Sequence, residues 1–485
     1  MNIPCADLKA RAHQAMLDEG FHPDFPPAVL NEAAKPAASE DWAALGFKDM
    51  RQLLWSSIDN DISRDLDQIE YAERLEDGTI RLMIGIADVD LEIPMNSETD
   101  KHAGSETTSV YTGVATYPML PDVFSTNRTS LLGQQERNAL IIEMHVSAEG
   151  EVDCKDVCLG RVLNYAKLAY SSTGGWLEGT NPIPQAIASV KGMEAQIRLQ
   201  YELSLRMQEF RKKSGSLSFD TIEPSAVMEN GDVKGLTVVR KTVASDIIES
   251  FMVAANVSIA KILREAKIPA IRRVVKTPRR WDRIQELATE YGVKLPDSPS
   301  AKALESFLTQ RKQMDPAHFA DLSLAVVKMM GSGEYLVTAI GHEDEGHFGL
   351  SVNDYTHSTA PNRRYPDLVT QRLVKALMRK QAAPYSLETL TLIAARCTER
   401  ESASRKVQRF MRKVIAACFL RNQIGTLFDA IITGVNPKGT FVRLLKFPAE
   451  GILMRGQKGV DVGDRVQVKL VSVDVKRGFI DFERR

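Results

Sequence analysis

The chain has 485 residues, 44% of them hydrophobic, with 62 lysines and arginines against 63 aspartates and glutamates. These values are ordinary for a folded globular protein of two to four domains. The net charge of −1 means that a nucleic-acid partner would have to be held by local basic patches. We find no signal peptide, no apolar run of 18 residues and no Cys/His zinc set, so we expect a cytoplasmic protein with reduced cysteines and no membrane contact.

Residues 1–45 look separate from the rest of the chain. Helix formers fill residues 7–19 and Gly20 is a plausible stop, and a second short helix is predicted at 28–34 after a run of prolines. The two helices are typical either of a small helix-turn-helix-like unit that contacts nucleic acid or of a helical cap packed on the main domain. The sequence leaves both alternatives open.

Residues 46–424 contain no strong linker. Apolar runs at 81–89 and 139–146 predict strands, and the proline-rich Y-P-M-L-P at 117–121 lies between them. Apolar spacing near 3.6 predicts helices at 246–263 and 367–380. Strands early and helices later indicate one large α+β domain.

Residues 425–485 predict a small closed β-barrel. Five short alternating segments are separated by Gly, Asn or Asp, which is typical of a five-stranded OB-fold and looks like the S1-type RNA-binding domain. Phe428 and Phe441 lie among basic residues, and aromatic rings beside cations are typical of a surface that binds single strands. The alternative is that some of these rings belong to the barrel core.

An acidic cluster at residues 59–70 has three interpretations. An EF-hand calcium loop fits the ligand spacing, but Arg64 stands where the turn needs glycine and the flanks predict strands rather than helices. A solvated surface loop does not explain the alternation of Asp65, Leu66 and Asp67, which points Leu66 toward a core. The third interpretation is a Mg²⁺ site for phosphoryl chemistry, since clustered carboxylates need a cation to remain ionised.

Ordered motifs along residues 45–424 resemble the ribonuclease II (RNB-domain) exoribonucleases. The first is I-D-N-D-I-S-R-D-L-D-Q at 58–68, against a family pattern of I-D followed five residues later by D-x-D-D. Others are G-S-L-S-F at 215–219 and I-I-E-S-F-M-V-A-A-N at 247–256. The most specific is H-F-G-L at 347–350 with Y-T-H-S-T-A-P-N-R-R-Y-P-D-L at 355–368.

The resemblance implies a processive enzyme that hydrolyses single-stranded RNA from its 3′ end and releases 5′-mononucleotides with Mg²⁺. It would act as a monomer. Carried over residue by residue, the resemblance implies a metal site at Asp59, Asp65, Asp67 and Gln68, with Asp65, Asp67 and Arg363 acting on the scissile phosphate. It also implies RNA contacts at Tyr111, Tyr170, Phe219 and Glu249, and Arg364 is either structural or in contact with RNA.

Two departures from the family pattern matter. Gln68 stands where the family has its fourth aspartate, so a second hypothesis is an RNA-binding protein on an RNB scaffold whose catalysis is weakened or lost. Residues 1–45 are too few for the paired cold-shock domains that usually precede the catalytic domain. A basic stretch at 396–413 is expected either to flank an RNA channel or to be a solvated helix.

Overall fold

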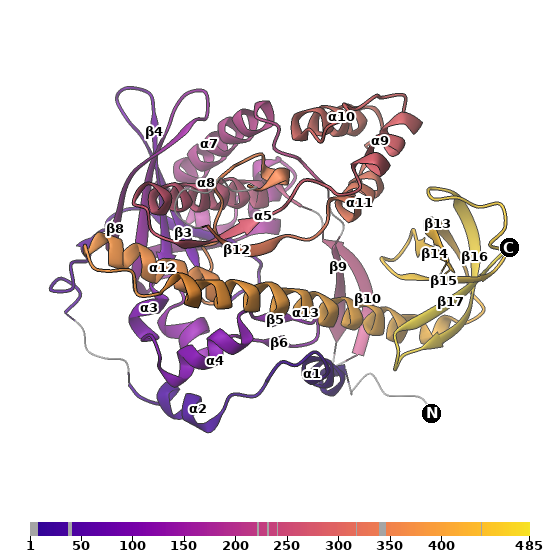
Figure 1. Ribbon diagram of the computed structural model, residues 1–485, viewed down its shortest axis with the longest axis horizontal. Coiled ribbons are helices and arrows are strands. Elements are labelled where there is room, and N and C mark those ends of the chain that lie inside the picture. Colours follow the sequence, from indigo (N-terminus) through magenta and orange to yellow (C-terminus); the bar gives the residue numbers. More distant parts are fainter. Residues whose placement is uncertain are drawn as a thin grey trace.

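The computed structural model describes residues 8–36, 41–220, 223–229, 232–239, 241–316, 318–338, 346–437 and 439–485. It confirms an α+β architecture with a closed five-stranded barrel at the C-terminal end and two short helices near the N-terminal end. Figure 1 shows the barrel at one side of the molecule, joined to the main body by one long helix, α13 (Leu387–Leu420).

The main sheet has six strands in the order β1-β8-β2-β3-β4-β7. Their bounds are Lys48–Asp49 for β1, Trp55–Asp59 for β2, Gln68–Arg74 for β3, Ile80–Ala87 for β4, Glu136–Val146 for β7 and Val152–Ala169 for β8. Strand β8 pairs with β7 over its first part and with β2 over its last part, so the sheet curls back on itself. The strands expected at 81–89 and 139–146 are therefore confirmed as β4 and β7.

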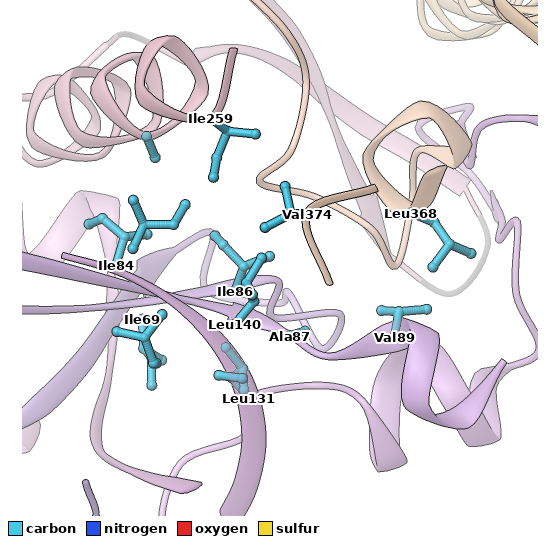
Figure 2. Close-up of a cluster of buried hydrophobic side chains, with 14 of the residues drawn as sticks. Ile69, Ile84, Ile86, Ala87, Val89, Leu131, Leu140, Ile259, Leu368 and Val374 are labelled. Atoms are coloured by element: carbon cyan, nitrogen blue, oxygen red, sulfur yellow. The ribbon is translucent and has the colours of Figure 1, made fainter. Parts of the chain in front are cut away.

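Helices α7 (Met193–Lys213), α8 (Val243–Glu265) and α12 (Tyr365–Met378) pack on the sheet, and the last two confirm the helices expected at 246–263 and 367–380. Figure 2 shows Ile84 and Ile86 of β4 on the side of the sheet that faces Ile259 of α8 and Val374 of α12, and Ile69 of β3 on the other side, all within one buried cluster. Thr242 and Ser245 form a capping box that fixes the start of α8.

Helix α8 is long and apolar enough to cross a membrane by length and composition. However, 67% of the most apolar 18-residue stretch of this helix is buried inside the structure, as in the core helix of a folded domain.

Buried ion pairs fix α12 beside the end of β4. Lys375 lies 2.8 Å from Asp88 and 2.9 Å from Asp90, and Arg372 lies 2.7 Å from Asp100. Both cations are almost fully buried. Separating either cation from its carboxylate partner would leave a buried charge without a counterion, which costs much free energy, so the paired geometry is strongly favoured. The start of α12, and the loop before it, are thereby held in one place.

A lobe with its own core contains α9 (Trp281–Glu290), α10 (Ala301–Met314) and α11 (Phe319–Met330). Two small two-stranded sheets lie against α13, β9 (Glu223–Glu229) with β10 (Asp232–Val239) and β11 (Ala270–Val274) with β12 (Glu334–Thr338). None of these elements was predicted from the sequence. Further short elements include α3 (Val89–Glu92), α4 (Glu98–Glu106), α5 (Tyr170–Leu177), α6 (Gln185–Ala188), β5 (Val110–Tyr111) and β6 (Thr116–Tyr117).

The described N-terminal helices, α1 (Leu8–Asp18) and α2 (Pro27–Ala33), pack on the main domain as a cap. Helix α1 shares a core with α13, and Glu32 of α2 accepts hydrogen bonds from the backbone N–H groups of Glu98 and Thr99 at the start of α4. The basic stretch 396–413 lies within α13 and partly serves this cap, since Arg400 is buried against the ring of Phe21.

The barrel consists of β13 (Leu427–Asn436), β14 (Gly439–Leu444), β15 (Glu450–Arg455), β16 (Arg465–Asp474) and β17 (Phe479–Arg484). Arg443 of β14 pairs with Asp321 of α11, so this cation contacts the lobe. Cys154, Cys158 and Cys397 are free thiols, as expected for reduced cysteines.

Candidate active site

The acidic cluster lies in the connection between the neighbouring strands β2 and β3. Asp59 is the last residue of β2 and Asp67 immediately precedes β3. Leu66, between Asp65 and Asp67, is 1% exposed and belongs to the main core, as the alternation predicted. Because successive side chains of an extended chain point to opposite sides, the side chains of Asp65 and Asp67 point away from the core that Leu66 enters.

Asp67 is held by the loop that precedes α12, almost 300 residues later in the chain. Its Oδ1 accepts a hydrogen bond of 2.9 Å from the backbone N–H of Asn362, and its Oδ2 accepts one of 3.1 Å from Nε of Arg363. The Asp67 carboxylate is 1% exposed, whereas the Arg363 side chain is 44% exposed. The guanidinium therefore keeps its two Nη groups open to a ligand while Nε fixes its plane.

Burial raises the pKa of Asp67 to about 7, although Arg363 and the N–H of Asn362 act in the opposite direction. A folded-state pKa above the usual 3.8 means that the folded protein binds this proton more tightly than the unfolded chain.

The free energy of unfolding of the metal-free protein should therefore fall as pH rises from about 4 to about 7, and level off above that. The contribution of Asp67 is on the order of 4 kcal/mol, from 1.36 kcal/mol per pKa unit. Urea unfolding in EDTA at pH 5 and pH 8 should show a smaller loss for Asp67→Asn than for wild type. An equal loss in both proteins would contradict the assignment.

The other two aspartates are also occupied by donors from the protein. Oδ2 of Asp65 accepts a hydrogen bond of 2.8 Å from the Tyr111 hydroxyl, and Oδ1 of Asp59 accepts bonds from Ser63 Oγ at 2.9 Å and from the N–H of Asn60 at 2.6 Å. Among the described residues, no three His, Cys, Asp or Glu side chains are grouped so as to hold a metal ion. The hard oxygen donors nevertheless suit Mg²⁺, which typically takes one or two carboxylates with water and a phosphate.

Gln68 and Glu70 both lie on β3 next to the cluster. Gln68 is 6% exposed, and Glu70 is fully buried with neither carboxylate oxygen bonded within the described part of the chain. Burial, together with the charge of Asp59, raises the pKa of Glu70 well above its ordinary value. Tyr170 is the first residue of α5. Burial raises the pKa of its hydroxyl, and the nearby negative charges of Asp59 and Glu70 raise it further.

A cavity of about 990 Å³ includes Phe219 and Glu249 in its lining, whereas Asp59, Asp65 and Asp67 do not line it. Thr242, also in the lining, donates a hydrogen bond of 3.2 Å to the carbonyl oxygen of Tyr170 and so joins the cavity wall to the acidic side. Glu249 is 2.6 Å from Lys241, and Phe219 also packs against the core of the α9–α11 lobe. Neither residue lies against Asp67.

Three residues expected to contact RNA, Arg364, Phe428 and Phe441, differ in how accessible they are to a ligand. Arg364 lies 2.7 Å from the buried Asp367, which favours the structural alternative for this arginine. Phe428 is 7% exposed within the barrel core, so the expectation that its ring stacks on RNA is corrected by the structure. Phe441 is only half-buried on β14 and keeps part of its ring accessible.

Three residues at or beside the acidic cluster were not predicted as site residues: Asn362, Ser63 and Glu70. Asn362 acts through its backbone N–H, which carries no side-chain signal, and its own Oδ1 accepts a bond of 2.5 Å from Thr129. Ser63 stands four residues after Asp59, a spacing that local side-chain bonding could have indicated. Glu70 follows Gln68 by two positions, so the two side chains share one face of the strand, and this spacing could have indicated that Glu70 lies beside Gln68.

Comparison with known proteins agrees with these motifs. Residues 47–380 match the RNB domain, and residues 426–485 match the RNase II-type exonuclease C-terminal S1 domain. Ribonuclease R 1 of Lactococcus lactis is 27% identical over 95% of this chain, which spans only 59% of that protein's length.

Solved structures share the fold. The RNase R of Mycoplasma genitalium, in a complex with ribose-methylated single-stranded RNA, has a TM-score of 0.88 at 22% identity and covers 99% of this chain and 78% of its own. Yeast Ssd1, described as a pseudonuclease, has a TM-score of 0.71 at 16% identity and covers 95% of this chain and 57% of its own. With the RNB match over more than half of its length, the chain belongs to the RNB-domain family and carries an RNase II-type C-terminal S1 domain.

Proposed function

We propose that the chain is a processive 3′-to-5′ exoribonuclease that hydrolyses single-stranded RNA to 5′-mononucleotides with Mg²⁺. The observation that supports this most directly is the contact of Arg363 with Asp67, beside Asp59 and Asp65. A merely structural ion pair would not need an open guanidinium face next to further carboxylates. That arrangement suits a phosphodiester, because the guanidinium can bind the phosphate oxygens while the carboxylates can hold a metal ion beside them.

Each residue has a task that its surroundings support. The Nη groups of Arg363 bind the phosphate oxygens and stabilise the charge that develops on them. Tyr111, whose hydroxyl is held by Asp65, positions the last nucleotide. Asp59, Asp65, Asp67 and the amide oxygen of Gln68 would hold Mg²⁺, which when bound lowers the pKa of a water and polarises the phosphate.

The second candidate is an RNA-binding protein without catalysis. Gln68 in place of a carboxylate favours it, and Ssd1 has this fold and is described as a pseudonuclease. The fold therefore does not decide between the two functions. The retained set of Asp59, Asp65, Asp67 and Arg363 favours the enzyme, because binding RNA alone does not require these four residues together.

The test uses a 5′-labelled single-stranded RNA, and DNA of the same sequence as the control. We expect progressive shortening from the 3′ end in Mg²⁺, none in EDTA, and nucleoside 5′-monophosphates as products of an internally labelled RNA. If the enzyme is processive, an excess of unlabelled RNA added after the labelled RNA has bound should not stop degradation of the labelled RNA. RNA that shifts in a gel but stays intact would reject the nuclease and select the binding protein.

The two barrel phenylalanines should separate RNA binding from folding. Phe441→Ala should weaken binding of single-stranded RNA about tenfold with little change in stability, since a stacked base contributes about 1–3 kcal/mol. Phe428→Ala should instead lower the free energy of unfolding of the barrel by about 3–5 kcal/mol, because it leaves a cavity in the core. Fluorescence anisotropy and urea unfolding measure the two effects. Equal RNA affinity for Phe441→Ala and wild type would remove Phe441 from the RNA contact.

A further inference from the structure

Arg211 is a cation in the wall of the cavity that contains Phe219 and Glu249, and it lies in the last turn of α7. The one hydrogen bond that its guanidinium makes with the described residues runs from Nη2 to Oγ of Ser250, at 3.0 Å. Its Nε is buried and has no acceptor in the described part of the chain. A guanidinium does not lose its proton in a protein, so Arg211 remains charged although its bonded partner is neutral.

The carboxylates of the same cavity wall already have other partners. Lys241 lies 2.5 Å from Asp246 and 2.6 Å from Glu249, so these two charges are paired without Arg211. The other acidic residues of the lining are engaged as well: Asp220 pairs with Lys312, Glu209 pairs with Lys213, and Glu178 accepts a bond from the N–H of Val243. Burial lowers the pKa of Arg211, and the charges of Glu249 and Asp246 offset this only in part. Arg211 is therefore the cation of this wall best placed to take an anion from outside the protein.

The rest of the lining suits an extended ligand with aromatic and anionic parts. Phe219 contributes an aromatic ring, and the exposed Lys212 places a second cation next to Arg211. No described carboxylate forms an ion pair with Lys212. The volume of about 990 Å³ is at the upper end of the range of small-molecule sites, which is more room than a single small anion needs.

The cavity wall is connected to the acidic cluster through Tyr170. The hydroxyl of Thr242, in the lining, donates to the carbonyl oxygen of Tyr170, and the Tyr170 side chain lies within reach of the charges of Asp59 and Arg363. Because the acidic cluster itself does not line the cavity, a strand that ends at the cluster would place its earlier nucleotides in the cavity.

We propose that Arg211 binds one internucleotide phosphate of the RNA strand, on the 5′ side of the linkage that is hydrolysed. This inference rests on the proposed function, because it takes RNA as the ligand and the acidic cluster as the position of the 3′ end. The planar guanidinium fits phosphate oxygens through charge-assisted hydrogen bonds, and its bond to Ser250 fixes its orientation. Arg211 acts on the affinity and the placement of the strand and takes no part in the chemical step.

RNA binding by the full chain in EDTA, followed by fluorescence anisotropy, tests the inference without any degradation. The probes are oligouridylates of about ten nucleotides, each with one uncharged methylphosphonate linkage at a different position. Each has a reference RNA with the same ribose methylation and an ordinary phosphodiester. In wild type, the methylphosphonate at the Arg211 position should weaken binding about tenfold. In Arg211→Gln the same methylphosphonate should weaken binding less than about twofold, while the effects at all other positions stay as in wild type.

The salt dependence of binding gives a second readout. For Arg211→Gln, the slope of log affinity against log salt should be less steep by about 0.7, the value for one phosphate contact on a single strand. Arg211→Lys should keep the wild-type slope and bind about threefold more weakly, only where the linkage carries its charge. This variant also keeps the test decisive if Arg211→Gln does not fold. The matched control is Arg198→Gln on the same helix, where the exposed arginine pairs with Glu194 at 3.0 Å and does not line the cavity; its affinity and slope should equal those of wild type.

Several outcomes would overturn the inference. One is a methylphosphonate series in which every position has the same effect in wild type and in both Arg211 variants. Another is an effect of Arg211 on the binding of uridine 5′-monophosphate alone, which would assign the residue to a released nucleotide. A single linkage that depends on Arg211, in a chain that never shortens RNA, would keep the inference and reject the nuclease. RNA degradation by a chain in which no linkage depends on Arg211 would do the reverse, and a wild-type chain that binds no RNA would reject both.

Discussion

Replacing Asp67 by Asn should abolish RNA degradation, with a rate at least about 10³-fold below wild type, while RNA binding stays close to wild type. The substitution preserves the shape of the side chain and an acceptor for the N–H of Asn362 but removes the charge. The loss follows from the proposed task of Asp67, since charge stabilisation at a metal-assisted phosphate contributes several kcal/mol and each 1.36 kcal/mol is a factor of ten in rate. Single-turnover degradation with excess protein measures it.

The matched control for this variant is Asp61→Asn. Asp61 lies in the same connection between β2 and β3, is exposed, and accepts a hydrogen bond of 3.0 Å from Ser171. The same chemical change there should leave the rate within about twofold of wild type. If Asp67→Asn degrades RNA as fast as Asp61→Asn, the acidic cluster is not the catalytic centre, whatever the family resemblance implies.

Local patterns in the sequence predicted the elements of the fold but not their long-range contacts. Alternation placed Leu66 in the core and 3.6-residue spacing predicted α8, because both depend on neighbouring residues only. The contact between Asp67 and Arg363 joins residues 296 positions apart, and no local periodicity encodes it. Only the family resemblance brought these two residues together before the structure was known.

Burial was the least predictable property of the candidate site residues. Polar residues at 68 and 70 of β3 would ordinarily indicate a solvated face, but α7 packs against β3 and Glu70 is buried there. In the barrel, a period of two separates two faces of each strand without saying which one faces inward, so Phe428 and Phe441 could not be told apart. Which side of a strand another element covers is decided by tertiary packing alone.

Arg363→Lys should retain the fold and most of the affinity for RNA, but lower the single-turnover rate about 10³-fold. Lysine keeps the positive charge near Asp67 but has neither the Nε–H that donates to Oδ2 nor the planar pair of Nη groups that fits two phosphate oxygens. The loss is expected in the rate and not in binding, because an arginine at the transferring phosphate acts mainly on charge that develops in the transition state.

The comparison for Arg363→Lys is Arg379→Lys at the exposed end of α12, which should behave as wild type. If Arg363→Lys instead weakens RNA binding about 10³-fold and leaves the rate of degradation in the bound complex unchanged, Arg363 only holds the RNA strand in place. The Asp67 contact would then serve to orient a binding residue, and the arginine would have no part in the reaction. A lowered rate in the bound complex is the result that places the open guanidinium face at the scissile phosphate.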